Sequence, residues 1–319
     1  MPWSTPVPVY LWAAVCIPAA VLLWIKCPRN KVTAYFLALN YAAVTLFCFW
    51  TINWVMVTYW LRFLAVLSAF FILGRAIYIT WYRPWLPRNW RGISLLVVAL
   101  LLLPFEIYAN VLVYPAFGFQ NYKDKPVLMM VPGDGMWVVL NGGNAIDGWG
   151  VNNTLDGLFP PDGPSDHSMG YSVDMTKMIT AGTLSTAGSL NPDFRSYDGF
   201  GTPVRTPCEG DVVYVEDSHL DVEVGTKIEG LGNRVVLKCV DYYVTVAGLR
   251  EIAVKVGDHI KLLQFLGYLG NNAAPSIPHV HIHATLNSYG PDGTPVPILF
   301  EPFWFTIWEF APRNHVFIR

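Results

Sequence analysis

Hydrophobic positions dominate the first third of this chain, whereas the remainder alternates short apolar runs with polar turns. A helix needs about 20 mostly apolar residues to cross a bilayer, and residues 9–25 and 93–113 each provide such a stretch. Residues 32–81 are too many for one span, so we interpret them as two helices that turn near residues 53–60. The pattern therefore predicts four transmembrane helices.

Basic residues indicate the orientation of these helices, because cytoplasmic loops carry an excess of Lys and Arg. The predicted first and third loops are basic, which places both on the cytoplasmic side. The N-terminus, the second loop and everything after Tyr114 then lie outside, whereas three helices would place the polar region inside. The basic residues are Lys26, Arg29 and Lys31 in the first loop and Arg83, Arg88 and Arg91 in the third.

Two ionisable residues, Arg62 and Glu106, fall within the predicted helices toward the outer leaflet. Charged residues inside a membrane are costly and are often functional, so one interpretation is an ion pair between them. The other is that both side chains extend to the membrane interface, and the pattern favours this second interpretation.

From residue 123 onward, short β-rich runs alternate with Gly, Pro, Asn and Asp, which is typical of strands joined by turns. Residues 142–191 are so rich in turn-forming residues that we expect mostly loop there. The sequence predicts a membrane anchor at residues 1–114, a linker at 115–124 and an all-β domain at 125–319. The expected strands are 127–131, 136–140, 211–215, 233–240, 242–247 and 280–286.

Charge and cysteine content narrow the partners and the compartment. The 319 residues carry a formal net charge of −2, whereas nucleic-acid binding needs a basic surface, so we expect no nucleic-acid partner. The five cysteines form no Cys-x-x-Cys pattern, which argues against a thiolate zinc site. Cys208 and Cys239 lie in the polar region, where an oxidising compartment permits a disulfide. The sequence leaves this pairing open.

Three histidines, His279, His281 and His283, alternate along one predicted strand. Alternate side chains of a strand point to the same face, so these imidazoles can converge on one metal ion or place a ligand beside a proton-transfer group. A surface histidine run is the alternative, but this run lies inside the domain. Catalytic zinc needs three protein ligands and one open position. The other candidate ligands are His167, Asp174, Asp217, His219 and His259.

Several segments resemble the lysostaphin- or LytM-like zinc metallopeptidases in content and order, over roughly residues 138–300. Residues 166–174 are similar to the first motif of that family, in which a His and a following Asp bind zinc. The separation of seven residues between His167 and Asp174 is longer than the commonest one in the family. Residues 201–204 read Gly-Thr-Pro-Val and residues 278–281 read Pro-His-Val-His, similar to a structural strand and to the His-x-His motif of the family.

The resemblance implies an antiparallel β-sheet domain of the duplicated hybrid motif type with a Zn²⁺ site. His167, Asp174 and His281 would be the zinc ligands, His279 the catalytic histidine and His283 an added group beside the ligands. The resemblance also implies cleavage of peptidoglycan cross-link peptides by a multi-pass protein of the bacterial cytoplasmic membrane. Its C-terminal domain would be extracytoplasmic, and its partners would be the lipid bilayer and a peptidoglycan peptide.

One position departs from the family pattern. The second catalytic histidine of the family precedes a Leu after the central strand, and this chain has Gly248 there. That histidine is not a zinc ligand, so its loss removes a proton-transfer group, worth roughly 10²–10⁴-fold in rate, without removing the metal site. Three interpretations follow: an active endopeptidase, a zinc-binding domain without catalytic activity, or a structural subunit of a membrane protein complex.

Overall fold

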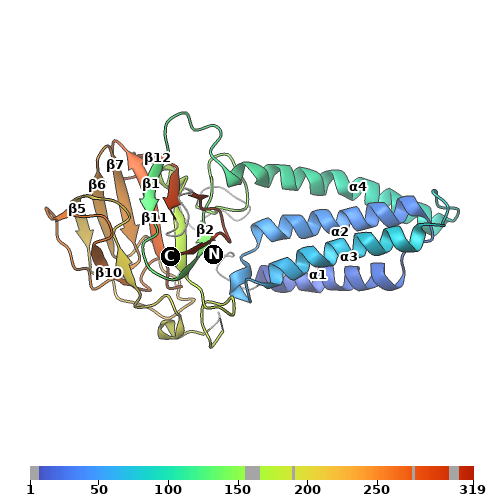
Figure 1. Ribbon diagram of the computed structural model, residues 1–319, viewed down its shortest axis with the longest axis horizontal. Coiled ribbons are helices and arrows are strands. Elements are labelled where there is room, and N and C mark those ends of the chain that lie inside the picture. The colour runs from blue at the N-terminus through green and yellow to red at the C-terminus, as the bar shows by residue number, and fades with distance from the viewer. Residues whose placement is uncertain (1–6, 155–165, 189–190, 275–276, 302–308) are drawn as a thin grey trace.

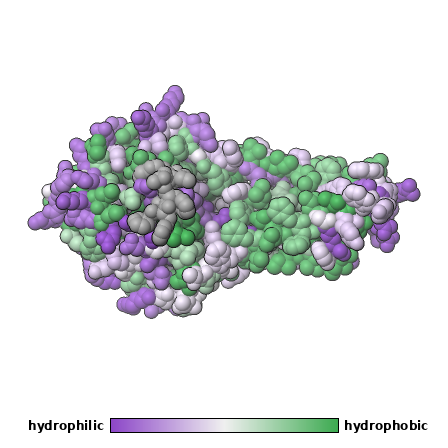
Figure 2. Space-filling model, viewed as in Figure 1, coloured by the Kyte–Doolittle hydropathy of each residue, from purple (hydrophilic) through white to green (hydrophobic). Residues whose placement is uncertain are grey.

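The structure is a computed structural model that describes residues 7–154, 166–188, 191–274, 277–301 and 309–319. A bundle of long helices forms one end of the molecule, and a β-rich domain forms the other (Figure 1). On the face shown in Figure 2, the helical end is mostly hydrophobic, whereas the surface of the β domain is largely polar. This is the two-part architecture that the sequence predicts.

Within the described residues, four helices are long and apolar enough to cross a membrane, which confirms the predicted number. The turn predicted near residues 53–60 is confirmed as well, because α2 ends at Thr51 and α3 begins at Leu61. Asn30 and Asn89 cap α2 and α4, since each side chain accepts a hydrogen bond from a backbone N–H of the first helical turn. The helices are α1 (Val7–Ile25), α2 (Lys31–Thr51), α3 (Leu61–Thr80) and α4 (Trp90–Val113).

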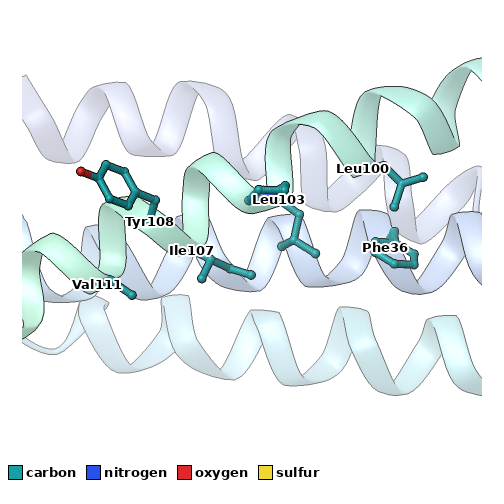
Figure 3. A pocket seen from close by; sticks show the side chains of 7 residues that line it. Phe36, Leu100, Leu103, Ile107, Tyr108 and Val111 are labelled. Carbon is teal, nitrogen blue, oxygen red and sulfur yellow. The ribbon is translucent and has the colours of Figure 1, made fainter.

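The helical bundle exposes much of its apolar surface. Helix α2 packs against both α3 and α4, and a groove of about 430 Å³ runs along α4 beside α2 (Figure 3). The hydrocarbon chains of a bilayer would cover such surfaces at no cost to hydrogen bonding, because helices satisfy their own backbone groups. The groove is lined by Phe36, Leu100, Leu103, Pro104, Ile107, Tyr108 and Val111.

The β domain is built around one antiparallel sheet of nine strands. Its order is β15-β2-β3-β11-β7-β6-β5-β9, and β12 pairs with β11 beside this path. All six predicted strands are confirmed, but the prediction missed β3, which lies in the segment expected to be mostly loop, and the short strands β9, β12 and β15. The strands are β2 (Met136–Asn141), β3 (Val173–Lys177), β5 (Gly210–Glu216), β6 (Arg234–Cys239), β7 (Tyr242–Ala247), β9 (His259–Ile260), β11 (Val280–Leu286), β12 (Thr294–Val296) and β15 (Val316–Ile318).

Two three-stranded sheets accompany the main sheet, in the orders β4-β10-β8 and β1-β13-β14. The pair β1 and β13 is parallel, unlike the antiparallel pairs of the main sheet. The strands are β1 (Val127–Met130), β4 (Pro203–Arg205), β8 (Leu249–Arg250), β10 (Phe265–Leu269), β13 (Ile298–Glu301) and β14 (Glu309–Phe310). The short 3₁₀ helices are η2 (Trp54–Met56), η3 (Tyr114–Phe117), η4 (His167–Met169) and η5 (Phe194–Ser196).

One face of the main sheet carries the hydrophobic core of the domain. Val280 and Ile282 of β11 point into this core, together with inward-facing residues of β6 and β7. Because side chains alternate along a strand, the histidines between them must point to the opposite face. A disulfide between Cys208 and Cys239 joins the turn before β5 to the end of β6.

The loop between α2 and α3 docks on the β domain. Val55 and Met56 of this loop form a buried cluster with Val138 and Leu140 of β2. At the start of α3, Arg62 donates a hydrogen bond to the backbone oxygen of Asn314, at 3.0 Å. Among the described residues Arg62 forms no ion pair with Glu106, so that interpretation is wrong: the guanidinium binds a carbonyl of the β domain instead.

Candidate metal centre

The candidate site forms where β3 and β11 lie side by side in the main sheet. Their register places Asp174 opposite His281, so both side chains point to the face away from the core. The Oδ1 atom of Asp174 lies 2.6 Å from Nδ1 of His281, which is a direct hydrogen bond. The sheet therefore brings together a carboxylate and an imidazole that are 107 residues apart in the chain.

His283 continues this hydrogen-bonded row along β11. Its Nδ1 atom lies 2.9 Å from Nε2 of His281, so one hydrogen bond joins Asp174 to His281 and a second joins His281 to His283. All three side chains are buried, as is that of His279. The prediction that the alternate histidines share one face of the strand is confirmed.

His279 has one ring nitrogen fixed and the other without a hydrogen bond. Its Nδ1 lies 2.6 Å from the backbone oxygen of Ile277, and a carbonyl only accepts, so Nδ1 must carry the proton. In the neutral ring, Nε2 then presents a lone pair, 3.9 Å from Oδ1 of Asp174. This Nε2 is buried and has no hydrogen-bond partner among the described residues. Buried polar atoms are normally satisfied, so a lone pair in this position suits a metal ion or its bound water.

Burial sets the protonation of the site. It would raise the pKa of Asp174, but the hydrogen bonds and charges of His281, His279 and Asn141 together hold that pKa below its ordinary value. Burial lowers the pKa of His279, and it lowers the pKa of His283 well below the ordinary value, with the neighbouring His281 adding to the effect. The site therefore holds an ionised carboxylate beside two imidazoles that are neutral at neutral pH, which are the forms that bind metals.

These pKa shifts predict a domain that loses stability in mild acid. In the unfolded chain a histidine titrates near pH 6.5, so below that pH the unfolded state binds protons that folded His279 and His283 refuse. The free energy of unfolding is therefore highest above about pH 6.5. Below that pH it falls by about 1.4 kcal/mol per pH unit for each histidine that stays neutral in the folded state. Guanidinium unfolding of the detergent-solubilised protein at several pH values measures this slope. His283→Gln should make the slope shallower, and an unchanged slope would contradict the assignment.

His167 lies apart from the other predicted ligands. It is exposed and belongs to η4, a turn that packs against β11 and β12. Throughout the part of the chain that the structure describes, no group of three or more His, Cys, Asp or Glu side chains is arranged to hold a metal ion. The donor chemistry of Asp174 and His281 fits zinc, which accepts carboxylate oxygen and imidazole nitrogen. The structure thus brings two of the three predicted ligands together.

A cavity of about 410 Å³ lies over the His283 end of the row. Arg234 of β6 and Tyr289 form part of its wall. Asp166 and Ser168 of the η4 turn also line it, so His167 sits between two residues that face the same cavity as His283. A ligand in this cavity can reach His283.

Gly248 follows β7 directly beside the site, and its backbone excludes a side chain. Its φ angle is +79°, a conformation that is costly for residues with a Cβ atom. A Cβ atom added there would also come within 2.3 Å of the backbone oxygen of His279. The glycine is therefore part of how β7 and β11 fit together, and a histidine cannot occupy this position on the present backbone.

Two further residues of the site lie outside the sequence prediction. Asn141, at the end of β2, donates a hydrogen bond from Nδ2 to Oδ2 of Asp174, at 3.2 Å. Arg313, in the tail before β15, donates from Nη2 to Oδ1 of Asn141, at 3.1 Å. Neither residue carries a local pattern that points to a metal site, because their roles depend on contacts 33 and 172 residues away in the chain.

The fold and the site together define a protein with four candidate membrane-spanning helices and a β domain that carries three buried alternate histidines. Residues 193–292 match the model of Peptidase family M23, so the chain carries a Peptidase M23 domain. The matched segment contains His279, His281 and His283, whereas His167 and Asp174 precede it. This family match agrees with the resemblance inferred from the sequence.

Solved structures of peptidases are similar to parts of this chain. Lysostaphin, an antimicrobial peptidase from Staphylococcus simulans, is 24% identical over 42% of this chain and 42% of its own, with a TM-score of 0.28. The catalytic domain of the prophage-encoded M23 protein EnpA from Enterococcus faecalis is 19% identical over 55% and 91%, with a TM-score of 0.29. A zinc containing peptidase from Vibrio cholerae is 16% identical over 53% and 39%, with a TM-score of 0.33. The chain thus spans less than half the length of lysostaphin, and comparison with curated proteins gave no match.

Proposed function

We propose that this chain is a membrane-anchored zinc endopeptidase that cleaves peptide cross-links of peptidoglycan on the outer side of a bacterial cytoplasmic membrane. The observation that carries the proposal is the buried pair of Asp174 and His281, which lies beside the unpartnered Nε2 of His279. A carboxylate and an imidazole held in contact, next to a free imidazole lone pair, are the parts of a hydrolytic metal site.

Asp174 and His281 would hold the metal in place of the hydrogen bond that joins Oδ1 to Nδ1, with His167 as the third ligand. A bound zinc ion supplies a Lewis acid and a water molecule of lowered pKa. His279 can accept or return a proton at Nε2, because the carbonyl of Ile277 keeps the other nitrogen protonated. Because Asp174, His279 and His281 are buried, bulk water does not compete for their polar atoms. His167 already lies in a turn whose neighbouring residues face the cavity over His283.

The proposed location follows from charge and from the cysteines. The basic loops at residues 26–31 and 83–91 favour the cytoplasmic side, and with four spans the β domain then lies on the other side. A disulfide between Cys208 and Cys239 suits an oxidising, extracytoplasmic compartment. Docking of the loop between α2 and α3 on the β domain would hold the site close to the membrane surface.

Gly248 supports a second candidate function. Because the backbone at this position leaves no room for the second catalytic histidine, the domain would then bind zinc and a peptide, or a membrane protein partner, without cleaving it. Reproducible co-purification of other membrane subunits, together with zinc binding and no hydrolysis, would favour this candidate.

Metal analysis of the purified full-length protein tests the zinc site. We expect about one zinc ion per chain, and we expect Asp174→Asn to lose most of it, because the amide is a much weaker zinc ligand than the carboxylate. Asp211→Asn is the matched control, since Asp211 makes the same kind of hydrogen bond to His259, at 2.7 Å, on the protein surface. Wild-type protein that contains no zinc and takes up none on addition would end the proposal.

A further inference from the structure

Arg313 is a buried cation that lies between the site and the helical bundle. Only 4% of its surface is exposed. Its Nη1 donates to the backbone oxygen of Thr51 at 2.6 Å and to that of Gly150 at 3.1 Å, and its Nε donates to that of Leu140 at 3.2 Å. Thr51 is the last residue of α2, so one guanidinium joins the end of a candidate span to the end of β2.

Asn141 connects this guanidinium to Asp174. Its Oδ1 accepts from Arg313 and its Nδ2 donates to Oδ2 of Asp174. The amide cannot be reversed, because its N–H groups would then face the N–H groups of Arg313 and its oxygen would face the carboxylate. Arg313 and the backbone N–H of Asn153, which donates to the same Oδ1 at 2.9 Å, therefore fix which end of Asn141 points at the site. Asp174 is held at Oδ2 and presents Oδ1 to His281.

Burying the guanidinium of Arg313 costs free energy unless its hydrogen bonds are all formed. A buried guanidinium loses its hydration and must be compensated by hydrogen bonds, and Arg313 makes four of them. Burial lowers the pKa of Arg313 to about 9 and Asp174 counteracts this effect, so the side chain stays cationic at neutral pH. The positive charge of Arg313 also compensates the negative charge of Asp174, which lies on the other side of Asn141.

We propose that Arg313 is a positioning residue of the zinc site, which acts through Asn141 to orient Asp174 and is itself held by the end of α2. This inference rests on the proposed function, because it concerns a ligand of the same metal ion. The orientation of the ligand then depends on the hydrogen bond from Arg313 to the end of α2 as well as on the β sheet.

The test uses the full-length protein in detergent, stripped of metal and titrated with Co²⁺, whose absorption bands report the ligands around the ion. Arg313→Met and Asn141→Ala should each weaken Co²⁺ binding by about 10–100-fold, the usual effect of losing a group that supports a metal ligand. The double variant should bind no more weakly than the weaker of the two single variants, because both changes break one connection. Arg313→Lys keeps the positive charge but lacks the planar guanidinium, so its Co²⁺ affinity should lie between those of Arg313→Met and the wild type.

Arg62→Met is the matched control. Arg62 also ties the helical bundle to the tail, through Asn314, but none of its hydrogen bonds reaches the site among the described residues. It should change the unfolding midpoint and leave Co²⁺ affinity within about twofold of wild type.

Each outcome decides the inference. Unchanged Co²⁺ affinity in Arg313→Met and Asn141→Ala would overturn it while leaving the zinc site intact. Equal losses in Arg62→Met would also overturn it, because the effect would then belong to docking alone. If Arg313→Met does not fold, Asn141→Ala carries the test. Wild-type protein that binds no Co²⁺ and no Zn²⁺ would end the proposed function and this inference with it.

Discussion

Replacing His279 with alanine is expected to slow hydrolysis of wall peptides by roughly 10²–10⁴-fold, which is the contribution of one positioned acid–base group. Of the three alternate histidines, His279 is the one whose Nε2 is fully buried without a hydrogen-bond partner among the described residues, and its Nδ1 is bonded to the backbone oxygen of Ile277. The variant should keep its zinc, because Asp174 and His281 remain. The assay is the release of new amino termini from purified peptidoglycan, with metal content measured on the same samples.

His259→Ala is the control for this variant. His259 is exposed and lies beside Asp211 and Glu209, away from the site, so its removal should leave the rate unchanged. Full activity in His279→Ala would contradict the role given to His279. An equal loss in both variants would show that the assay does not report on the site.

Replacing Gly248 with histidine is expected to destabilise the β domain by about 3 kcal/mol or more, instead of restoring a second catalytic histidine. The change combines a left-handed backbone conformation, costing about 1–3 kcal/mol, with an overpacked contact that costs a similar amount. The contact is with the backbone oxygen of His279, so the site itself would be displaced. The unfolding midpoint and the zinc content of the variant measure both effects.

Gly257→His separates the two contributions. Gly257 has a φ angle of +92° and open space around the position of a Cβ atom, so this variant should show only the backbone cost, about 1–3 kcal/mol. If Gly248→His were as stable as Gly257→His, the close contact with His279 would not matter. If Gly248→His were more active than the wild type, position 248 would accept a catalytic histidine, which would contradict this account.

The fold was predictable wherever a pattern is local. Short runs of β-forming residues bounded by turn residues identified β6, β7 and β11. The length of residues 32–81 separated α2 from α3, although the turn contains neither Gly nor Pro. Strand β3 was missed because it is short and follows a segment rich in Gly, Asn and Asp. Its strand conformation depends on pairing with β2 and β11 on either side.

The candidate site was predictable only in part, for a related reason. The spacing of His279, His281 and His283 is local, so their common face could be read from the sequence. Asn141 and Arg313 act through contacts between distant segments, and the residues next to them in the sequence form no motif that indicates this role. The backbone conformation of Gly248 is equally invisible in the sequence, which gives the absence of a histidine but not its structural reason.

The measurement that tests the central proposal most directly is the release of new amino termini from purified peptidoglycan by the zinc-loaded, full-length protein. We predict that peptides are released, that a chelator stops the release and that added zinc restores it. Protein that holds zinc through Asp174 and His281 and yet releases nothing would contradict the endopeptidase proposal, and would leave the binding function that Gly248 supports.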